Sequence, residues 1–403
     1  KQKKYDGMNA RLREALAGVR IVKAFVRQKF ENERFDASAM EVRAAALKPQ
    51  RQLAVLMGFL FFIAYIAYGA VFYFGGLDVL NARDFSVGQV TAAAEYILMT
   101  LFPLFIFASI LPFFSLAKAS LKRVYTLIDE QSDIVDAPDA VEVRPQDVKG
   151  RIAFEGVSLR YRTAGGKDTA PILKEIDLVI EPGQTVGFLG ATGSGKSSLI
   201  GLVPRFYDVS AGRVTIDGID VRRMRQHDLR RITAVCLQEP VLFSATIERN
   251  IAFGTKELDH DNVEVVAKAS DAHGFISIIP EGYDFHVARR GANLSGGQRQ
   301  RVSIARALAI HPRILILDDS TSAVDISTEA RIQEAIASFA PDCTKLIVAQ
   351  RISSVITADR IVLMEEGKIV ATGTHEQLLR ASPLYQEIFE TQLGAGRSKE
   401  VAE

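Results

Sequence analysis

The 403-residue sequence predicts an α-helical segment with two membrane spans, followed by an α/β domain built on a mainly parallel sheet. Two long runs, residues 53–77 and 96–117, contain no charged side chain, and each is long enough to cross a hydrocarbon core of about 30 Å as a helix. From residue 150 onward, short β-rich runs alternate with helical runs, which is typical of parallel strands covered by helices. A glycine-rich motif joins one of these strands to the next helix.

Composition and charge exclude some classes of protein. The formal net charge is +1, so the chain has no basic excess with which to neutralise the phosphates of a nucleic acid. Its two cysteines, Cys236 and Cys343, make no disulfide framework, and we expect both to be reduced, buried thiols.

Residues 1–48 are polar and predict a helix with one apolar face. The apolar positions of that face are Leu12, Leu16, Val19, Val22 and Val26. The predicted spans follow at about residues 53–80 and 86–117. Lysine and arginine flank the outer ends of this pair, whereas the turn between the spans, which also contains Asn81 and Asp84, has only Arg83. By the positive-inside rule, both flanks are cytoplasmic, which predicts a multi-pass protein of the cell membrane with its α/β domain in the cytoplasm.

Residues 129–149 contain two prolines and several acidic residues, and we interpret them as a linker. In the domain that follows, apolar runs predict strands at residues 151–161, 178–190, 313–318 and 345–350. The predicted boundaries are therefore 1–128 for the membrane part, 129–149 for the linker and 150–403 for the α/β domain.

The glycine-rich motif runs from Gly190 to Ser197 and fits the phosphate-loop pattern G-x-x-x-x-G-K-[ST]. It follows a predicted strand and precedes a helical run, which distinguishes it from an ordinary glycine-rich turn, the alternative interpretation. Backbone N–H groups of such a loop bind phosphates, and we expect Lys196 to reach the β- and γ-phosphates of ATP. The expected ATP-binding residues of the loop are Gly193, Ser194, Gly195, Lys196, Ser197 and Ser198.

A second motif bears on magnesium. Residues 314–317 are apolar and are followed by Asp318. A buried strand that ends in a carboxylate places it beside the Mg²⁺ of a phosphate loop, to which Ser197 offers a hydroxyl. Apolar strands often end in aspartate, so the pattern gains its meaning from the phosphate loop.

The run LSGGQ at residues 294–298 precedes a helical stretch and resembles the signature motif of ATP-binding cassette (ABC) transporters. The resemblance extends over nearly the whole chain. It implies an α/β ABC ATPase domain with a helical subdomain that carries the signature. It also implies that the signature residues act on ATP bound by a second subunit: Ser295, Gly296, Gly297 and Gln298.

Three further positions match the family in the expected order. Tyr161 matches the aromatic residue that stacks on adenine, with a core tyrosine as the alternative. Gln238 matches the Q-loop glutamine that contacts Mg²⁺ and senses the membrane domain, with a solvated glutamine as the alternative. Residues 322–325, which end in Asp325, resemble the D-loop. The resemblance thus implies ATP and Mg²⁺ as cofactors, with Ser197, Gln238 and Asp318 as the metal site.

The N-terminal part is similar to the membrane domain of an ABC exporter. Residues 13–28 resemble the segment around the second intracellular coupling helix, and residues 74–90 resemble the link between the fifth and sixth membrane helices. An exporter half has six spans, so the resemblance predicts a fragment that lacks the first four. It further implies that residues 11–20 dock on the other subunit, with a generic amphipathic helix as the alternative.

The sequence departs from the family at the hydrolytic step. Asp319 stands where the general base is normally glutamate, and Gln350 stands at the switch position, which is normally histidine. The pattern resembles the degenerate subunit of a heterodimeric multidrug-type exporter, whose partner carries the consensus glutamate. A homodimer with an aspartate base is the alternative. Arg289 replaces an acid that contributes to coupling-helix contacts, and that part of the resemblance stays open.

The predicted function is the ATP-binding subunit of an exporter that uses ATP hydrolysis to move a drug, lipid or peptide-like substrate across the bilayer. An ATP-gated channel or regulator is the rival interpretation. An aromatic stripe in the first span either lines a substrate cavity or faces lipid or a neighbouring helix. Glu95, in the second span, either is functional or reaches the outer interface. The members of the aromatic stripe are Phe61, Tyr65, Tyr68 and Phe72.

Overall fold

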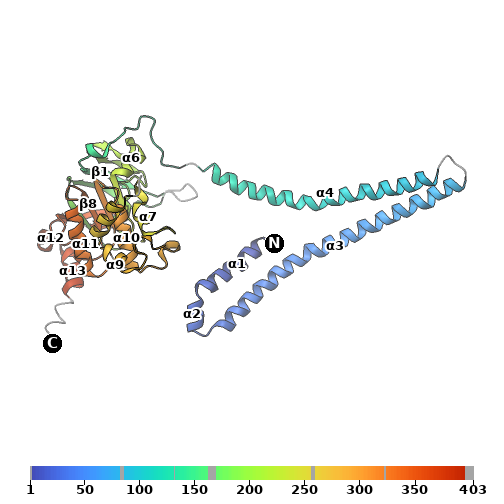
Figure 1. The fold of residues 1–403 in the computed structure, drawn as a ribbon, viewed down its shortest axis with the longest axis horizontal. Helices are drawn as coiled ribbons and strands as arrows, with labels where there is room; N and C mark the ends of the chain where they lie inside the picture. The colour runs from blue at the N-terminus through green and yellow to red at the C-terminus, as the bar shows by residue number, and fades with distance from the viewer. Residues whose placement is uncertain are drawn as a thin grey trace. The chain divides into compact units, whose positions relative to one another are not determined.

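The computed structural model divides into two compact units, Lys1–Gln131 and Ser132–Glu403 (Figure 1). The first unit is helical, and the second combines sheets with helices. The structure describes residues 2–81, 86–130, 132–161, 169–255, 259–321 and 324–394.

In the first unit, two long helices follow two short ones (Figure 1). These are α1 (Gln2–Ala17), α2 (Val19–Ala24), α3 (Gln28–Leu80) and α4 (Val87–Ile128). Helix α1 packs beside the first part of α3, where Lys4 and Glu41 form an ion pair at 2.6 Å and Arg11 donates a hydrogen bond to Ser38. These contacts fix the N-terminal hairpin of the unit.

The predicted apolar face from Leu12 to Val26 is wrong at its C-terminal end. Helix α1 ends at Ala17, α2 begins at Val19, and Val26 lies in the left-handed region with φ 53°. Glycine at position 18 favours the interruption, because glycine is a poor helix former. The chain turns between the end of α2 at Ala24 and the start of α3 at Gln28. The apolar positions therefore do not lie on one continuous helix.

Helix α3 continues from polar residues into the apolar run, so the first predicted span is the C-terminal part of a longer helix. Among the described residues, α3 is the one helix long and apolar enough to cross a membrane, with a mean hydropathy of 2.2 over its most apolar stretch. The second predicted span lies within α4, many of whose side chains fall outside the described residues. Of the predicted turn between the spans, Arg83 and Asp84 also fall outside the described residues.

Helices α3 and α4 pack closely where the last turns of α3 meet the first turns of α4. A Cβ atom at Gly75 of α3 would lie 2.8 Å from both methyl carbons of Val90 in α4. Val90 and Ala94 are buried there. The lack of a side chain at Gly75 therefore allows the two helices to approach each other.

The second unit contains a six-stranded and a four-stranded sheet. The larger sheet has the order β10-β9-β3-β8-β7-β6 and is parallel except for the β9–β10 pair. Its strands are β3 (Thr185–Leu189), β6 (Thr233–Cys236), β7 (Ile314–Asp318), β8 (Thr344–Val348), β9 (Arg360–Glu365) and β10 (Lys368–Gly373). The smaller sheet is antiparallel, with the order β2-β1-β4-β5. Its strands are β1 (Ile152–Leu159), β2 (Leu173–Ile180), β4 (Ala211–Ile216) and β5 (Ile219–Asp220).

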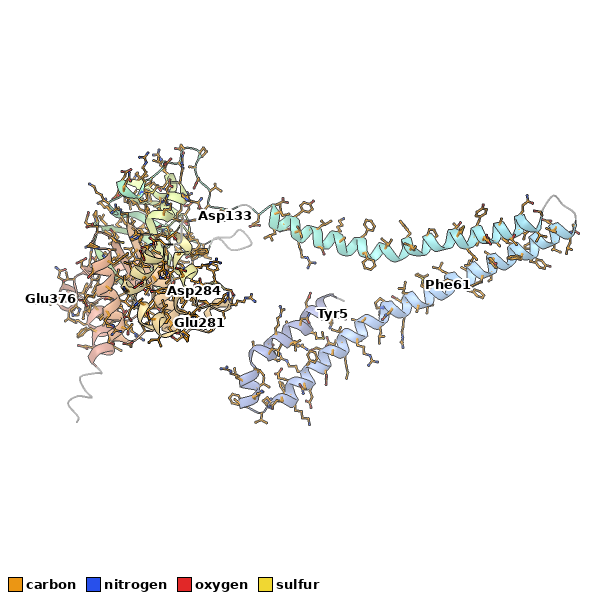
Figure 2. The ribbon with its side chains drawn as sticks, viewed as in Figure 1. Tyr5, Phe61, Asp133, Glu281, Asp284 and Glu376 are labelled. Carbon is orange, nitrogen blue, oxygen red and sulfur yellow. The ribbon has the colours of Figure 1, made fainter. Side chains whose placement is uncertain are left out.

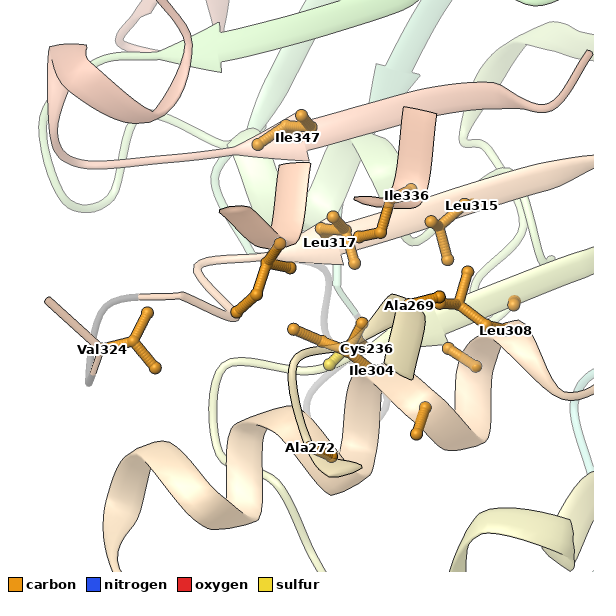
Figure 3. Close-up of a cluster of buried hydrophobic side chains, with 14 of the residues drawn as sticks. Cys236, Ala269, Ala272, Ile304, Leu308, Leu315, Leu317, Val324, Ile336 and Ile347 are labelled. Atoms are coloured by element: carbon orange, nitrogen blue, oxygen red, sulfur yellow. The ribbon is translucent and has the colours of Figure 1, made fainter. Parts of the chain in front are cut away.

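Two buried clusters hold these layers together. One face of the larger sheet packs on the smaller sheet and α5, with Phe154 and Phe188 among the fully buried side chains. The other face packs on helices through residues such as Ile304, Leu317 and Ile336 (Figure 3). The helices are α5 (Lys196–Ile200), α6 (Gln226–Ile232), α7 (Ile247–Ile251), α8 (His260–Ala269), α9 (His273–Ile278), α10 (Gly296–Leu308), α11 (Ile326–Phe339), α12 (His375–Ala381) and α13 (Pro383–Phe389). Short 3-10 turns occur at Pro145–Asp147, Val221–Arg223, Ala252–Gly254, Gly282–Asp284, Arg289–Gly291 and Ile352–Ser354, and a π-helical segment at Glu390–Gly394.

From residue 132 onward, two predicted segments differ from the structure. Residues 178–190, predicted as one strand, are the end of β2, a turn and β3. The turn contains Pro182 and Gly183, which has φ 74° and ends the extended run. Residues 132–149, predicted as linker, belong to the second unit, where Val143 and Val148 are buried and Asp136 accepts hydrogen bonds from Gln226.

Candidate nucleotide-binding and hydrolysis site

The phosphate loop, residues 190–195, leaves the buried strand β3 and enters α5 at Lys196. Gly193 and Gly195 adopt φ values of 85° and 98°, which favour glycine. A Cβ atom at Gly190 would lie 2.1 Å from the backbone oxygen of Met364 in β9. The close approach of β9 and the left-handed turns explain why glycine occupies these positions, and such a loop presents backbone N–H groups to an anion.

Lys196 folds back over this loop. Its Nζ donates hydrogen bonds to the carbonyl oxygens of Gly190 and Ala191 at 2.8 and 2.9 Å. Burial lowers the pKa of Lys196, and the negative charges of Asp318 and Asp319 oppose this shift. The lysine ammonium is therefore held beside the loop that would surround the phosphates.

Ser197 and Asp318 meet at the place where Mg²⁺ would bind. The Ser197 hydroxyl donates to Asp318 Oδ1 at 2.9 Å. Burial raises the pKa of Asp318, while the hydrogen bond from Ser197 and the charge of Lys196 partly offset the rise. A hydroxyl and a carboxylate fit Mg²⁺, which takes few protein ligands and completes its shell with phosphate oxygens and water. Across the part of the chain that the structure describes, no group of three or more His, Cys, Asp or Glu side chains could hold a metal ion.

Asp319 is held by two amides. Gln238 Nε2 and Gln350 Nε2 donate to Asp319 Oδ2 at 3.1 and 3.0 Å. The Asp319 backbone has φ 49°, and its N–H donates to the carbonyl oxygen of Val348 at 2.9 Å. Burial, and secondly the charge of Asp318, raise the pKa of Asp319. Residues from three separate motifs therefore meet here, with two amides donating to one carboxylate oxygen of the third residue.

A cavity of about 340 Å³ collects these groups. The phosphate loop and α5 form one wall, and the ends of β7 and β8 form another. The signature residues do not line this cavity. Its lining includes Thr192, Gly193, Gly195, Lys196, Ser197, Ser198, Gln238, Asp318, Asp319 and Gln350.

Tyr161 lies beside the phosphate loop. Its hydroxyl donates to Ser198 Oγ at 3.0 Å, and its ring packs edge-on against Tyr207, with 4.8 Å between centroids. These rings and Phe206 line a second cavity of about 200 Å³. Sequence reasoning missed Phe206 and Tyr207, although two adjacent aromatic residues shortly after α5 are a usable signal.

The signature residues begin helix α10. Ser295 Oγ accepts a hydrogen bond from the Gln298 N–H at 3.2 Å, and Gln298 Oε1 accepts from the Ser295 N–H at 2.8 Å, which forms a capping box. Ser295 is exposed, while Gly296, Gly297 and Gln298 are half-buried. Arg289 precedes them and is exposed in the 3-10 turn Arg289–Gly291. The helix N-terminus is thus formed and partly open to solvent.

The D-loop is described only in part. Asp325 caps α11, since its carboxylate accepts hydrogen bonds from the Thr328 N–H at 3.0 Å and from Ser327 Oγ at 2.5 Å. These bonds hold the pKa of Asp325 well below its usual range. Ser322 and Ala323 lie outside the described residues.

The candidate transport residues lie in the first unit. Phe61, labelled in Figure 2, is exposed on α3. Tyr65 and Phe72 are also exposed on this helix, and Tyr68 packs edge-on against Phe72, with 5.1 Å between centroids. Glu95 is exposed on α4. Within this unit, the aromatic stripe is open to lipid, to a substrate or to a neighbouring helix.

Comparison with known proteins identifies both parts of the chain. The model of the ABC transporter family matches residues 173–322, and that of the ABC transporter transmembrane region matches residues 1–104. The uncharacterized ABC transporter ATP-binding protein YfiB of Bacillus subtilis is 36% identical over 98% of this chain and 67% of its own length. The chain belongs to the ABC transporter family. Its first unit corresponds to the membrane region and its second unit contains the ABC ATPase domain.

Other ABC transporters are similar over almost the whole chain. The ATP-dependent lipid A-core flippase of Syntrophus aciditrophicus is 36% identical over 94% of this chain and 62% of its own length. A putative multidrug export ATP-binding/permease protein of Staphylococcus aureus is 38% identical over 94% of this chain and 65% of its own length. This ABC transporter chain thus spans about two thirds of the length of these relatives. A solved structure of a bacterial Atm1-family ABC exporter with ATP bound has a TM-score of 0.82 and 29% identity, covering 97% of this chain and 68% of that one.

Proposed function

We propose that this chain is the ATP-binding subunit of an ABC exporter in the cell membrane, with its nucleotide domain in the cytoplasm. Its own ATP site hydrolyses slowly, and it works with a second, unlike half-transporter that has the usual glutamate base. The observation that supports this proposal is Asp319, whose carboxylate is held by Gln238 and Gln350 beside the phosphate loop.

Two physical reasons connect this geometry to slow hydrolysis. An aspartate is one methylene shorter than a glutamate, and a displacement of about 1 Å at a reacting group can cost on the order of 10²-fold in rate. In addition, the amides of Gln238 and Gln350 hold the shorter carboxylate at this position. Gln350 donates a hydrogen bond but cannot become cationic.

The signature supports a role toward a partner. Ser295 and Gln298 cap α10, and no residue of 295–298 lines the chain's own phosphate cavity. A helix N-terminus with a hydroxyl and backbone N–H groups is suited to a phosphate presented by another molecule. In the proposed pair, this intact signature completes the partner's hydrolytic site.

The proposed substrate is a drug, lipid or peptide-like molecule. Relatives include a lipid A-core flippase and a putative multidrug export protein. The exposed aromatic side chains on α3 suit an apolar or aromatic substrate. This part of the proposal concerns the whole transporter, of which the chain supplies the ATPase domain and part of the membrane region.

The double variant Asp319→Glu with Gln350→His tests the slow site. In an assembled transporter whose partner base is changed from glutamate to glutamine, only this site contributes to phosphate release. We expect turnover to rise on the order of ten- to a hundredfold, because the carboxylate advances and the switch side chain can become cationic.

The single variants serve as controls, and each should give only a fraction of the gain. Unchanged turnover in the double variant contradicts the proposal that these two positions limit the rate. Fast hydrolysis by the unmodified chain purified as a homodimer would instead support the alternative, a homodimeric exporter with an aspartate base.

A further inference from the structure

The C-terminal segment of the second unit returns to the switch position. Gln392, in the π-helical segment Glu390–Gly394, accepts a hydrogen bond through Oε1 from the Ile352 N–H at 2.8 Å. Its Nε2 donates to the carbonyl oxygen of Gln350 at 2.9 Å. One amide side chain therefore pairs with the backbone on both sides of residue 351.

We propose that Gln392 is a positioning residue for hydrolysis at this chain's ATP site. It fixes the backbone from which the Gln350 side chain reaches Asp319, so that the C-terminal segment sets the geometry of the switch. The expected effect on turnover rests on the proposed function of that site.

The switch segment, residues 349–352, is held at both ends. At the sheet, the Ala349 N–H donates to the carbonyl oxygen of Phe188 in β3 at 3.1 Å. At the far end, Gln392 pairs with Gln350 and Ile352. The side chain of Gln350 leaves this fixed backbone and donates to Asp319 Oδ2 at 3.0 Å. A shift of the backbone would move the amide that holds the carboxylate.

A cavity separates α13 from the phosphate loop, so close packing does not fill this region. It has a volume of about 300 Å³ and is lined by Thr192 of the loop, Gln350, and Leu384 and Ile388 of α13. Gln392 also lines it. Since open space lies between the helix and the loop, the hydrogen bonds of Gln392 are a direct connection from the C-terminal segment to the switch.

The position of Gln392 also limits the size of the effect. Its side chain is exposed, so water competes for both hydrogen bonds. Loss of the pair should therefore change the rate several-fold rather than abolish hydrolysis. The fold should tolerate the change, because Gln392 lies outside the two buried clusters.

Gln392→Met in the full-length chain tests the proposal, because methionine keeps the length of the side chain and removes both hydrogen bonds. Hydrogen exchange of the Ile352 amide should become several-fold faster. In the assembled transporter with an inactivated partner base, kcat for ATP should fall several-fold while KM changes less than twofold. Gln392→Glu keeps the acceptor for Ile352 and loses the donor to Gln350, so it should retain slow amide exchange and lose part of the rate.

Gln386→Met is the matched control. Gln386 is an exposed glutamine of α13 whose Nε2 donates to the carbonyl oxygen of Leu379 at 2.6 Å, away from the switch. This variant should leave both readouts unchanged. In a Gln350→Ala background, Gln392→Met should have no further effect on kcat, because the side chain that it positions is gone.

Three outcomes would overturn the positioning role. The Ile352 amide could exchange at an unchanged rate in Gln392→Met, or Gln386→Met could change exchange and kcat as much as Gln392→Met does. The third outcome is that Gln392→Met lowers kcat by its full factor even in the Gln350→Ala background. These outcomes are distinct from failure of the proposed function. Fast hydrolysis by a homodimer of this chain would refute the slow, heterodimeric site, yet exchange at Ile352 and its dependence on Gln392 are measured in either assembly.

Discussion

At the scale of single residues, the ATP site is held together by side chains that bind one another across the phosphate loop and β7. Lys196 binds loop carbonyl oxygens, and Ser197 binds Asp318. ATP and Mg²⁺ would replace these contacts with bonds to phosphate oxygens and metal. We therefore expect these side chains to decide how tightly the nucleotide binds.

Two substitutions test nucleotide binding at this scale. Lys196→Ala should remove engagement of the γ-phosphate and weaken ATP binding by about 1.5–3 kcal/mol, the range for hydrogen bonds to charged groups.

Tyr161→Ala should weaken binding of ATP and ADP alike by about 1–3 kcal/mol, because a stacking surface for the base is lost. Titration with a fluorescent nucleotide analogue, competed by ATP or ADP, measures both effects.

Tyr161→Phe provides the control for stacking. It keeps the aromatic face and loses only the hydrogen bond to Ser198, so affinity should stay close to that of the unmodified protein. Unchanged ATP affinity in both alanine variants contradicts the assignment of this cavity as the nucleotide site.

At the scale of elements, the N-terminus of α10 lies outside the chain's own phosphate cavity and has a proposed role toward a partner. The capping box of Ser295 and Gln298 fixes the first turn of α10, and Gly297 follows within that turn. Because residues 295–298 do not line the phosphate cavity, changes at this helix end should act on a nucleotide held elsewhere.

Gly297→Asp tests this separation. A carboxylate at the N-terminus of α10 would repel the γ-phosphate of the partner's ATP, so total ATPase activity of the assembled transporter should fall on the order of tenfold or more. ATP affinity of this chain's own site should change by less than twofold. Phosphate release and nucleotide titration on the same preparation measure the two quantities.

Gly274→Asp is a control with the same change of charge. Gly274 is exposed on α9, and a Cβ atom there would meet nothing within 4 Å. It should leave both quantities unchanged. If Gly297→Asp abolishes ATP binding by this chain but spares turnover of the assembly, the proposed geometry is wrong.

At the scale of the whole molecule, the asymmetry between an intact signature and an altered base has meaning only in a pair. In the proposed pair, each ATP would lie between the phosphate loop of one chain and the signature of the other. The capped N-terminus of α10 supports a contribution to the partner's ATP site. The Asp319 carboxylate, held by Gln238 and Gln350, supports slow hydrolysis at this chain's own site.

We therefore expect an unlike partner in the membrane. The affinity-tagged chain, purified in mild detergent, should co-isolate with a second ABC half-transporter in a 1:1 ratio, measured by native mass spectrometry. The partner should have glutamate after the aspartate that ends its equivalent of β7. Exclusive isolation of a homodimer with full ATPase activity would contradict a heterodimeric pair.

Several features follow from the sequence because they depend on contiguous residues. The phosphate loop needs glycine at positions that turn or meet a neighbouring strand, and Gly190 to Gly195 show this requirement in order. The uncharged run of α3 and the strand that ends in Asp318 are also local patterns. The physical cause of each of these features lies within one element, so each can be predicted from the sequence alone.

Features that join distant segments required the tertiary structure. The hydrogen bonds of Gln238 and Gln350 to Asp319, and the pairing of Gln392 with the switch backbone, connect residues that lie tens of positions apart. The antiparallel sheet of β1, β2, β4 and β5 likewise depends on pairing between separate segments. A hydrogen bond between an isolated side chain and a distant backbone leaves no period or motif in the sequence. The sequence by itself determined the family and predicted the ATP-binding residues, whereas only the tertiary structure decided which distant side chains pair with them, because that pairing depends on the fold and on no local pattern.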